Sequence, residues 1–472
     1  MIICVDEQLI TSYNRLDKNT RTSKSGESVM FKRTKYLNQL IDKKHNHLIK
    51  VITGIRRSGK SFLLNDIFYN YLLEEEKIKK DHIIKFAFDV DEDISLLDKY
   101  LPEQPTVTTV NGQQIVNNRK FILYINDQIK DQKDYYFLLD EIQNLDGFVR
   151  VLNGFLRHHN YDVYVTGSNS HLLSNNIDTE FGGRSSRIHL LPLTFNEYLS
   201  NSNLDKYASL AEYIQYGGIP LVQLQNNSEE KKSQTLSIYK DTYISDVKKR
   251  HPQVNENNLD ETLKVVASMI SAPINPTKIE NTFKSKYGIS LSNNVIGNYI
   301  NWFEDAFLLN KALRYDVKGR KYIGSPYKIY FEDIGVRNAI LNYREIDETD
   351  LIENIVYNEL RYRNYSVDVG VVYINEPTGK KDKGGKDIYA EKACEVDFVA
   401  NKSGKLYYIQ VASKIESEEK KEQEYKSIRN IPDSFKKIVI VKDDIISKQY
   451  TKDGFLRMNL LEFLTNENSL EW

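Results

Sequence analysis

Residues 54–61 read Gly-Ile-Arg-Arg-Ser-Gly-Lys-Ser, and this stretch decides the fold that we expect for the chain. A β-rich run over 48–53 precedes it, and apolar residues at helical spacing follow it over 61–79. The stretch matches G-x-x-x-x-G-K-[ST], in which glycines let the backbone wrap closely around phosphates and the next helix points its positive end at them. Strand, loop and helix together predict a phosphate-binding loop at the edge of a parallel sheet.

The residues of this loop have separate expected roles. We expect Lys60 to be catalytic by reaching the β- and γ-phosphates of ATP, and Ser61 to ligate Mg²⁺ through its hydroxyl. ATP and Mg²⁺ are therefore the predicted cofactors. A chance glycine-rich turn is the alternative, but the flanking strand and helix favour the phosphate loop. The further predicted nucleotide contacts are Gly54, Ile55, Arg56, Arg57, Ser58, Gly59 and Phe62.

An acidic pair follows a second apolar run, residues 136–139. This run reads as a buried strand, and it delivers Asp140 and Glu141 to the carboxyl edge of the sheet. We predict that Asp140 holds Mg²⁺ together with Ser61 and that Glu141 polarises the attacking water. Two acids after a strand are a weak signal alone, but downstream of a phosphate loop they indicate ATP hydrolysis.

Two further positions are predicted to complete this site. Ser168 and Asn169 follow the strand-like run 161–166, where a polar side chain can contact the γ-phosphate or the water, although a capped turn explains them equally well. Arg184 is the predicted arginine finger, acting in its own subunit or in a neighbour, with Arg187 as the alternative.

Composition limits the class of protein. The chain has 472 residues and a net charge of −1, which gives no support to a chain-wide nucleic-acid footprint. No apolar run reaches 18 residues, so we expect no membrane span. The two cysteines, Cys4 and Cys394, suit a reducing cytoplasm. Residues 1–29 read as a flexible leader, unless Met30 is the true start.

The segment 259–345 predicts a winged helix-turn-helix. Three helical runs, at 262–269, 276–287 and 292–306, precede a β-hairpin between 315 and 330. Basic side chains outnumber acidic ones ten to six over residues 260–328, and Lys318, Arg320 and Lys321 of the wing are placed to reach DNA phosphates. The alternative is a module that packs on the ATPase core as a lid or bridge.

Several stretches resemble the bacterial and archaeal AAA-type ATPases that carry a C-terminal nuclease-like domain of unknown function. The resemblance covers nearly everything from Met30 to about residue 465, and it implies an α/β multidomain protein. The expected parts are an AAA+-like P-loop domain over 30–200, a helical lid or linker over 201–258, the winged region over 259–345, and a restriction-endonuclease-like PD-(D/E)xK domain over 346–472. The matching stretches are 48–64, 139–144, 165–173, 183–199, 216–220, 315–321, 353–360 and 395–400.

Nucleases of that fold hold Mg²⁺ between an acid on one strand and an acid or glutamine on the next, and a lysine activates the water. Here Asp397, Gln410 and Glu353 are the predicted metal ligands, with Glu359 as an alternative to Glu353. Ala412 stands where those nucleases carry the lysine, and Lys414 lies two residues further on. This departure favours an inactive or weakly active domain over a working nuclease.

Two functions are therefore predicted. The first is an ATP-hydrolysing protein whose nucleotide state controls a DNA-binding or nuclease-like C-terminal half, in DNA processing or in defence against foreign DNA. The second is a nucleotide-dependent scaffold or switch that acts on a protein partner without DNA contact. A homo-oligomer is compatible with both.

Overall fold

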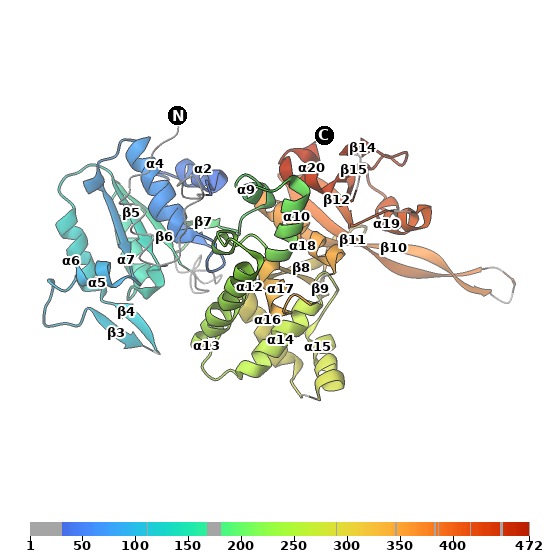
Figure 1. Ribbon diagram of the computed structural model, residues 1–472, viewed down its shortest axis with the longest axis horizontal. Coiled ribbons are helices and arrows are strands. Elements are labelled where there is room, and N and C mark those ends of the chain that lie inside the picture. The colour runs from blue at the N-terminus through green and yellow to red at the C-terminus, as the bar shows by residue number, and fades with distance from the viewer. Residues whose placement is uncertain are drawn as a thin grey trace. The chain divides into compact units, whose positions relative to one another are not determined.

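The computed structural model describes residues 31–110, 112–167, 181–288, 290–344, 347–381, 384–385, 387–415, 417–443 and 447–471 (Figure 1). All the elements below belong to one compact unit, Arg33–Trp472. The predicted leader lies outside the described residues. No helix of the described ranges is long and apolar enough to cross a membrane.

A five-stranded parallel sheet forms the first part of the described chain. Its strand order is β2-β5-β6-β1-β7, and every neighbouring pair is parallel, so all the carboxyl ends meet at one edge. The strand-like runs predicted at 48–53, 136–139 and 161–166 are confirmed as strands, whereas β7 was not predicted. The strands are β1 (Ile49–Thr53), β2 (Ile83–Ala87), β5 (Tyr135–Asp140), β6 (Tyr161–Thr166) and β7 (Ser185–His189).

Helices cover both faces of this sheet, because neighbouring residues of a buried strand point to opposite sides. Val51 packs in one core with Phe121 and Leu152, and Ile52 packs in another with Leu64 and Leu72. A separate hairpin consists of β3 (Val107–Val110) and β4 (Gln113–Val116). The helices here are α2 (Thr34–Asp42), α3 (Lys60–Phe62), the π-helix η1 (Leu63–Phe68), α4 (Tyr69–Glu74), η2 (Lys80–His82), α5 (Asp91–Ser95), α6 (Asn118–Gln128), η3 (Ile142–Asn144) and α7 (Phe148–Phe155).

A helical part follows, and its apolar core combines residues between 216 and 340 with Ile55 of the loop after β1. The three helices predicted before the hairpin are present as α14, α15 and α16. The hairpin after them is β8 (Leu309–Asp316) and β9 (Lys321–Phe331). The helices are α9 (Phe195–Leu199), α10 (Lys206–Tyr216), α11 (Pro220–Gln223), α12 (Ser228–Ser237), η5 (Ile238–Ile244), α13 (Ser245–Arg250), α14 (Glu256–Ser268), α15 (Pro276–Thr282), η6 (Phe283–Tyr287), α16 (Asn293–Asp305) and α17 (Ile334–Ile340).

An eight-stranded mixed sheet forms the last part, in the order β14-β15-β13-β12-β11-β10-β8-β9. Along the chain, helix α18 leads into three antiparallel strands, helix α19 and a strand parallel to β12. The elements are α18 (Glu348–Tyr362), β10 (Ser366–Lys381), β11 (Asp387–Lys402), β12 (Lys405–Ala412), α19 (Glu418–Arg429), β13 (Lys436–Val441), β14 (Lys448–Tyr450), β15 (Leu456–Asn459), α20 (Leu460–Thr465) and η7 (Ser469–Glu471).

Packing crosses two of the predicted domain limits. Strand β8 pairs with β10, so the predicted wing is part of the C-terminal sheet and not a free hairpin. Phe195 and Leu210 share one core with Leu351 and Phe398. The limits at 200, 258 and 345, the winged-helix fold and the nuclease-like fold stay predictions.

Candidate functional site

The loop between β1 and α3 lies at the carboxyl edge of the parallel sheet. Gly54 has φ +144° and Gly59 has φ +93°, values that L side chains rarely adopt. A Cβ atom on Gly54 would lie 2.2 Å from the carbonyl oxygen of Leu190. The first glycine is therefore required for the backbone to pass beside the end of β7 and turn into the loop.

The Lys60 side chain folds back into this loop. Its Nζ donates to the carbonyl oxygens of Gly54 at 3.0 Å and Ile55 at 3.2 Å, and the residue is 5% exposed. Burial lowers the pKa of Lys60, and the negative charges of Glu141 and Asp140 act in the opposite direction. The ammonium group is thus held by neutral carbonyl groups rather than by a carboxylate.

Asp140 closes β5 beside the loop. Its Oδ1 accepts from the Thr166 hydroxyl, and its Oδ2 accepts from the Asn65 amide at 3.4 Å. Burial raises the pKa of Asp140, whereas hydrogen bonds from Thr166 and Ser61 and the charge of Lys60 lower it. Ser61 and Asp140, predicted from separate motifs, therefore lie close enough for the Ser61 hydroxyl to lower the pKa of Asp140.

Glu141 follows in a left-handed conformation, with φ +50°. Its backbone N–H donates to the Thr166 hydroxyl at 3.2 Å, and its Oε2 accepts from the Gln143 amide. The sequence reasoning missed Asp89, which follows the adjacent strand β2. The Asp89 side chain is exposed, but desolvation at this crowded edge and the charges of Glu141 and Asp140 raise its pKa to about 6.

Residues of η5 and α13, in the predicted lid region, contact Arg56 of the loop. Arg56 Nη1 lies 2.5 Å from Asp246 Oδ1, and the buried Tyr243 hydroxyl donates to the Arg56 carbonyl at 3.2 Å. The charge of Arg250, on the same helix α13, interacts with those of Arg56 and Glu141. These contacts join residues almost 200 positions apart, so no local pattern predicted them.

The remaining predicted residues are placed differently. Ile55 and Ser58 are buried in the loop, Phe62 is half-buried and Arg57 is exposed. Ser168 and Asn169 lie outside the described residues. The predicted arginine finger, Arg184, has an exposed side chain. The Arg184 carbonyl accepts from the N–H of Ile49, the first residue of β1, so its backbone lies at the sheet edge opposite the phosphate loop.

Comparisons with known proteins agree with this geometry. Residues 46–199 match the family described as AAA domain, and residues 207–347 match a domain of unknown function, DUF8612. An uncharacterized protein of Haemophilus influenzae is 32% identical over 418 residues, which cover 87% of this chain and 93% of the relative. The chain belongs to the same protein family as this Haemophilus protein.

More distant relatives and solved structures are also similar. Uncharacterized protein MJ1544 of Methanocaldococcus jannaschii is 29% identical, covering 74% of this chain and 75% of its own. The Walker-type ATPase PABY2304 of Pyrococcus abyssi matches with a TM-score of 0.44 and 11% identity, over 69% of this chain and 99% of that one. The Aeropyrum pernix ORC1 protein, solved in complex with DNA, matches with a TM-score of 0.30 and 11% identity, over 67% and 94%.

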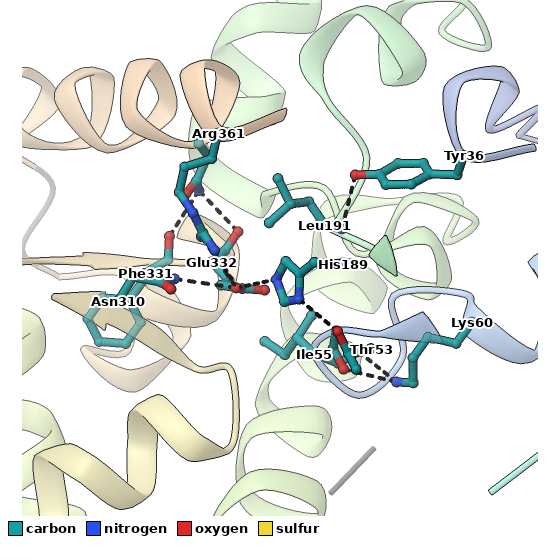
Figure 2. A network of polar contacts seen from close by, with 12 residues as sticks. Tyr36, Thr53, Ile55, Lys60, His189, Leu191, Asn310, Phe331, Glu332 and Arg361 are labelled. Carbon is teal, nitrogen blue, oxygen red and sulfur yellow. Dashed lines mark hydrogen bonds and ion pairs between the residues drawn. The ribbon is translucent and has the colours of Figure 1, made fainter. Parts of the chain in front are cut away.

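A polar network leads from the AAA domain to the C-terminal part (Figure 2). The His189 ring contacts Thr53 Oγ1 through Nδ1 at 3.2 Å and Glu332 Oε1 through Nε2 at 2.7 Å. Asn310 donates to the same Oε1 at 3.3 Å, and Arg361 of α18 lies 3.4 Å from it. Thr53 directly precedes the phosphate loop, so three short contacts separate that loop from α18.

Two side chains of helix α18 also form hydrogen bonds with the backbone at the end of β9. Asn354 accepts from the N–H of Phe331 at 2.7 Å and donates to its carbonyl oxygen at 2.8 Å, and Asn358 donates to the carbonyl of Glu332 at 3.1 Å. The next residue, Asp333, accepts from the N–H of Gly218 at 2.6 Å. The family-like stretches around 216–220 and 353–360 thus meet at residues 331–333.

The predicted metal ligands of the C-terminal part are only partly brought together. Asp397 and Glu353 are buried in one cluster, whereas Glu359 is paired with Arg363 at 2.7 Å. Gln410 is 9% exposed. Within the described residues, no three His, Cys, Asp or Glu side chains are arranged to hold a metal ion.

Proposed function

We propose that this AAA-domain protein binds ATP at the loop 54–61 and hydrolyses it with Mg²⁺. The observation that carries the proposal is the Lys60 ammonium, which lies inside the loop on two carbonyl oxygens, next to the Ser61–Asp140 pair. Carbonyl oxygens are neutral acceptors, so the oxygens of a bound triphosphate, which carry full charge, can take over these hydrogen bonds. A lysine ion-paired to a carboxylate would be harder to redirect.

The site fits both the nucleotide and the metal. Ser58 Oγ is buried and has no hydrogen-bond partner among the described residues, which suits a donor waiting for a phosphate oxygen. Ser61 and Asp140 offer the hydroxyl and carboxylate oxygens that Mg²⁺ takes from proteins when phosphates supply further ligands. Bound Mg²⁺ would offset the negative charge of the phosphates during transfer.

Each side chain then has a proposed task. Lys60 stabilises the β- and γ-phosphates, Gly54–Gly59 amides cradle them, and Glu141 accepts a proton from the attacking water. Arg56 is half-buried and its positive charge interacts with Glu141 and Asp89, whereas the Arg57 side chain is exposed. Since the Arg184 backbone is at the far edge of the sheet, we propose its finger role only toward a neighbouring subunit.

We further propose that nucleotide binding is transmitted to the C-terminal part through Thr53, His189 and Glu332. Glu332 is buried, and its Oε2 has no hydrogen-bond partner in the described part of the chain. His189, Asn310 and Arg361 all contact Oε1. A movement of the His189 ring would therefore change the ion pair between Glu332 and Arg361. DNA binding stays a separate prediction, to be tested on the exposed Lys318, Arg320 and Lys321 of the β8–β9 turn.

Phosphate release from ATP, with and without Mg²⁺, tests the main proposal. We expect Mg²⁺-dependent turnover in the wild type and a loss of about 10²–10³-fold in Lys60→Ala, the effect of removing one preorganised donor. Lys99→Ala is the matched control, because Lys99 is a 62% exposed lysine of the same domain. Equal turnover in wild type and Lys60→Ala would contradict ATP hydrolysis at this loop.

A further inference from the structure

A buried lysine lies among three carboxylates in the C-terminal part. Lys328 of β9 is 3% exposed, and its Nζ is 2.6 Å from Glu395, 2.9 Å from Glu353 and 3.9 Å from Asp397. Burial opposes the charge of Lys328, but the three carboxylates outweigh it and raise its pKa. The Lys328 ammonium group is therefore stabilised in its charged form by the carboxylates that surround it.

This cluster includes two of the three residues predicted to hold a metal ion, Asp397 and Glu353. The lysine expected from a nuclease is absent from β12, because Ala412 is its last residue and Lys414 lies beyond the strand. Lys328 enters instead from β9, which is remote both in sequence and in the order of the sheet. No spacing rule within the nuclease-like motif could have predicted its position.

Two of the carboxylate oxygens in this cluster already accept hydrogen bonds from groups of this chain. Glu353 Oε1 accepts from Lys328 and also from the Tyr330 hydroxyl at 2.5 Å. Asp397 Oδ2 accepts from the N–H of Val411 at 2.8 Å. Mg²⁺ requires oxygens at about 2.0–2.1 Å in octahedral geometry, so it would have to displace the ammonium group or lie beside a like charge.

Lys328 is also held in place by its strand. It pairs with Ala312 in the β8–β9 ladder, four residues before Glu332, so its backbone cannot withdraw without breaking that ladder. Gln410 Oε1 is buried and lacks a hydrogen-bond partner within the described ranges, and the pairing of Phe398 with Ile409 sets Gln410 opposite Asp397. Gln410 Oε1 thus adds one neutral oxygen beside Asp397, whereas the positive charge among the carboxylates is supplied by Lys328.

We propose that Lys328 is the resident cation of this acid cluster and takes the place of a metal ion, so that the C-terminal part does not cut nucleic acid. The cluster joins β9, α18 and β11 instead of forming a hydrolytic centre. This inference is independent of ATP turnover, because none of its residues touches the phosphate loop.

Mn²⁺ binding to the nucleotide-free full-length chain, followed by electron paramagnetic resonance, tests this directly. We expect the wild type and Asp397→Asn to bind the same number of Mn²⁺ ions, since Asp397 is not a metal ligand in either. Any Mn²⁺ that binds at Asp140 contributes equally to both chains. Loss of one bound ion in Asp397→Asn would overturn the proposal, even if no variant of Lys328 folds.

Lys328→Met gives the complementary result, because it keeps the apolar stem and removes the charge. We expect the folded variant to gain one Mn²⁺ site, and Lys328→Met/Asp397→Asn to lose it again. Lys405→Met, which changes a 66% exposed lysine of the same sheet, should gain none. A folded Lys328→Met chain that binds no additional ion would contradict the proposal.

Plasmid cleavage in Mn²⁺ provides the second readout. We expect no cutting by the wild type above that of Asp397→Asn. Mn²⁺-dependent cutting that disappears in Lys328→Met would instead make Lys328 a water-activating lysine, and the resident-cation proposal would be wrong.

Discussion

The phosphate loop and the C-terminal cluster each bury a lysine near acids, but the two ammonium groups have different partners. Lys60 donates to the carbonyl oxygens of Gly54 and Ile55, whereas Lys328 is ion-paired to Glu353 and Glu395. A carbonyl can be exchanged for a charged phosphate oxygen at little cost, but a buried ion pair cannot be broken without leaving charge uncompensated. The partners of a buried lysine, more than its burial, therefore distinguish a lysine that can bind a ligand from a lysine that only stabilises the fold.

The largest expected effect is on the chemistry at the first site. Glu141→Gln should bind ATP but turn it over about 10²–10⁴-fold more slowly, the usual contribution of a general base. Single-turnover phosphate release with radiolabelled ATP measures the rate, and filter binding measures retained ATP. Asp146→Asn, which alters an acid at the start of the following turn, is the control. A Glu141→Gln chain as fast as the wild type would remove Glu141 from this role.

The two lysines should also differ in what they contribute to stability. Lys328→Met leaves three acids without their cation and should lower the free energy of unfolding by about 3–5 kcal/mol. Lys60→Met removes hydrogen bonds to two carbonyls and should cost about 1 kcal/mol. Urea denaturation of both variants without nucleotide makes the comparison. Equal losses would mean that the two ammonium groups are held in the same way.

The contribution of Glu395 can be isolated by a double-mutant cycle with Lys328. Because Glu395 is the acid nearest to Lys328, at 2.6 Å, Glu395→Gln should destabilise the wild type more than it destabilises Lys328→Met. Additive losses in the same urea titrations would show that this pair is not coupled.

A smaller effect is expected at the contacts that connect the phosphate loop with helix α18. His189→Ala removes the contact between Thr53 and Glu332 and should reduce the coupling between nucleotide and α18, a free energy of about 1–3 kcal/mol in proteins of this kind. Hydrogen exchange of residues 348–362 with and without a slowly hydrolysed ATP analogue measures it. We expect nucleotide-dependent protection in the wild type and none in His189→Ala. Unchanged protection in the variant would exclude this route.

The smallest effect is expected at the ion pair between Arg56 of the loop and Asp246 of α13. Arg56 is 42% exposed, so its ion pair with Asp246 is screened and should contribute no more than about 1 kcal/mol. Asp246→Asn should therefore change the affinity for ATP less than tenfold in calorimetric titrations. A larger loss would place Arg56 among the residues that bind the phosphates.

Local patterns predicted the strands around the first site because each strand is a contiguous run, while the roles of the site residues stay predictions. The loop, Asp140 and the strands β1, β2, β5 and β6 each carry their own periodicity or spacing. Strand β7 was missed because Ser185–His189 lacks an apolar run, and with it His189. Without β7, the sequence could not show that the Arg184 backbone lies at the amino ends of the strands, and its role as an arginine finger stays a prediction.

The second region was harder to predict because its key contacts join distant segments. Strands β10 and β11 extend well beyond the predicted runs, since their outer halves are polar and exposed. Lys328 belongs to a hairpin predicted as a DNA-binding wing, and nothing in its local sequence links it to Asp397. Glu332 and Asp333 likewise each have a partner more than 100 residues away, His189 and Gly218.

A crystal structure of Glu141→Gln grown with ATP and Mn²⁺ tests both halves of the comparison in one experiment. We predict that Lys60 Nζ moves from the loop carbonyls to the phosphates, with an anomalous Mn²⁺ peak between Ser61 and Asp140 and no peak near Asp397. An anomalous peak between Asp397 and Glu353, or bound ATP with Lys60 still on Gly54 and Ile55, would contradict it.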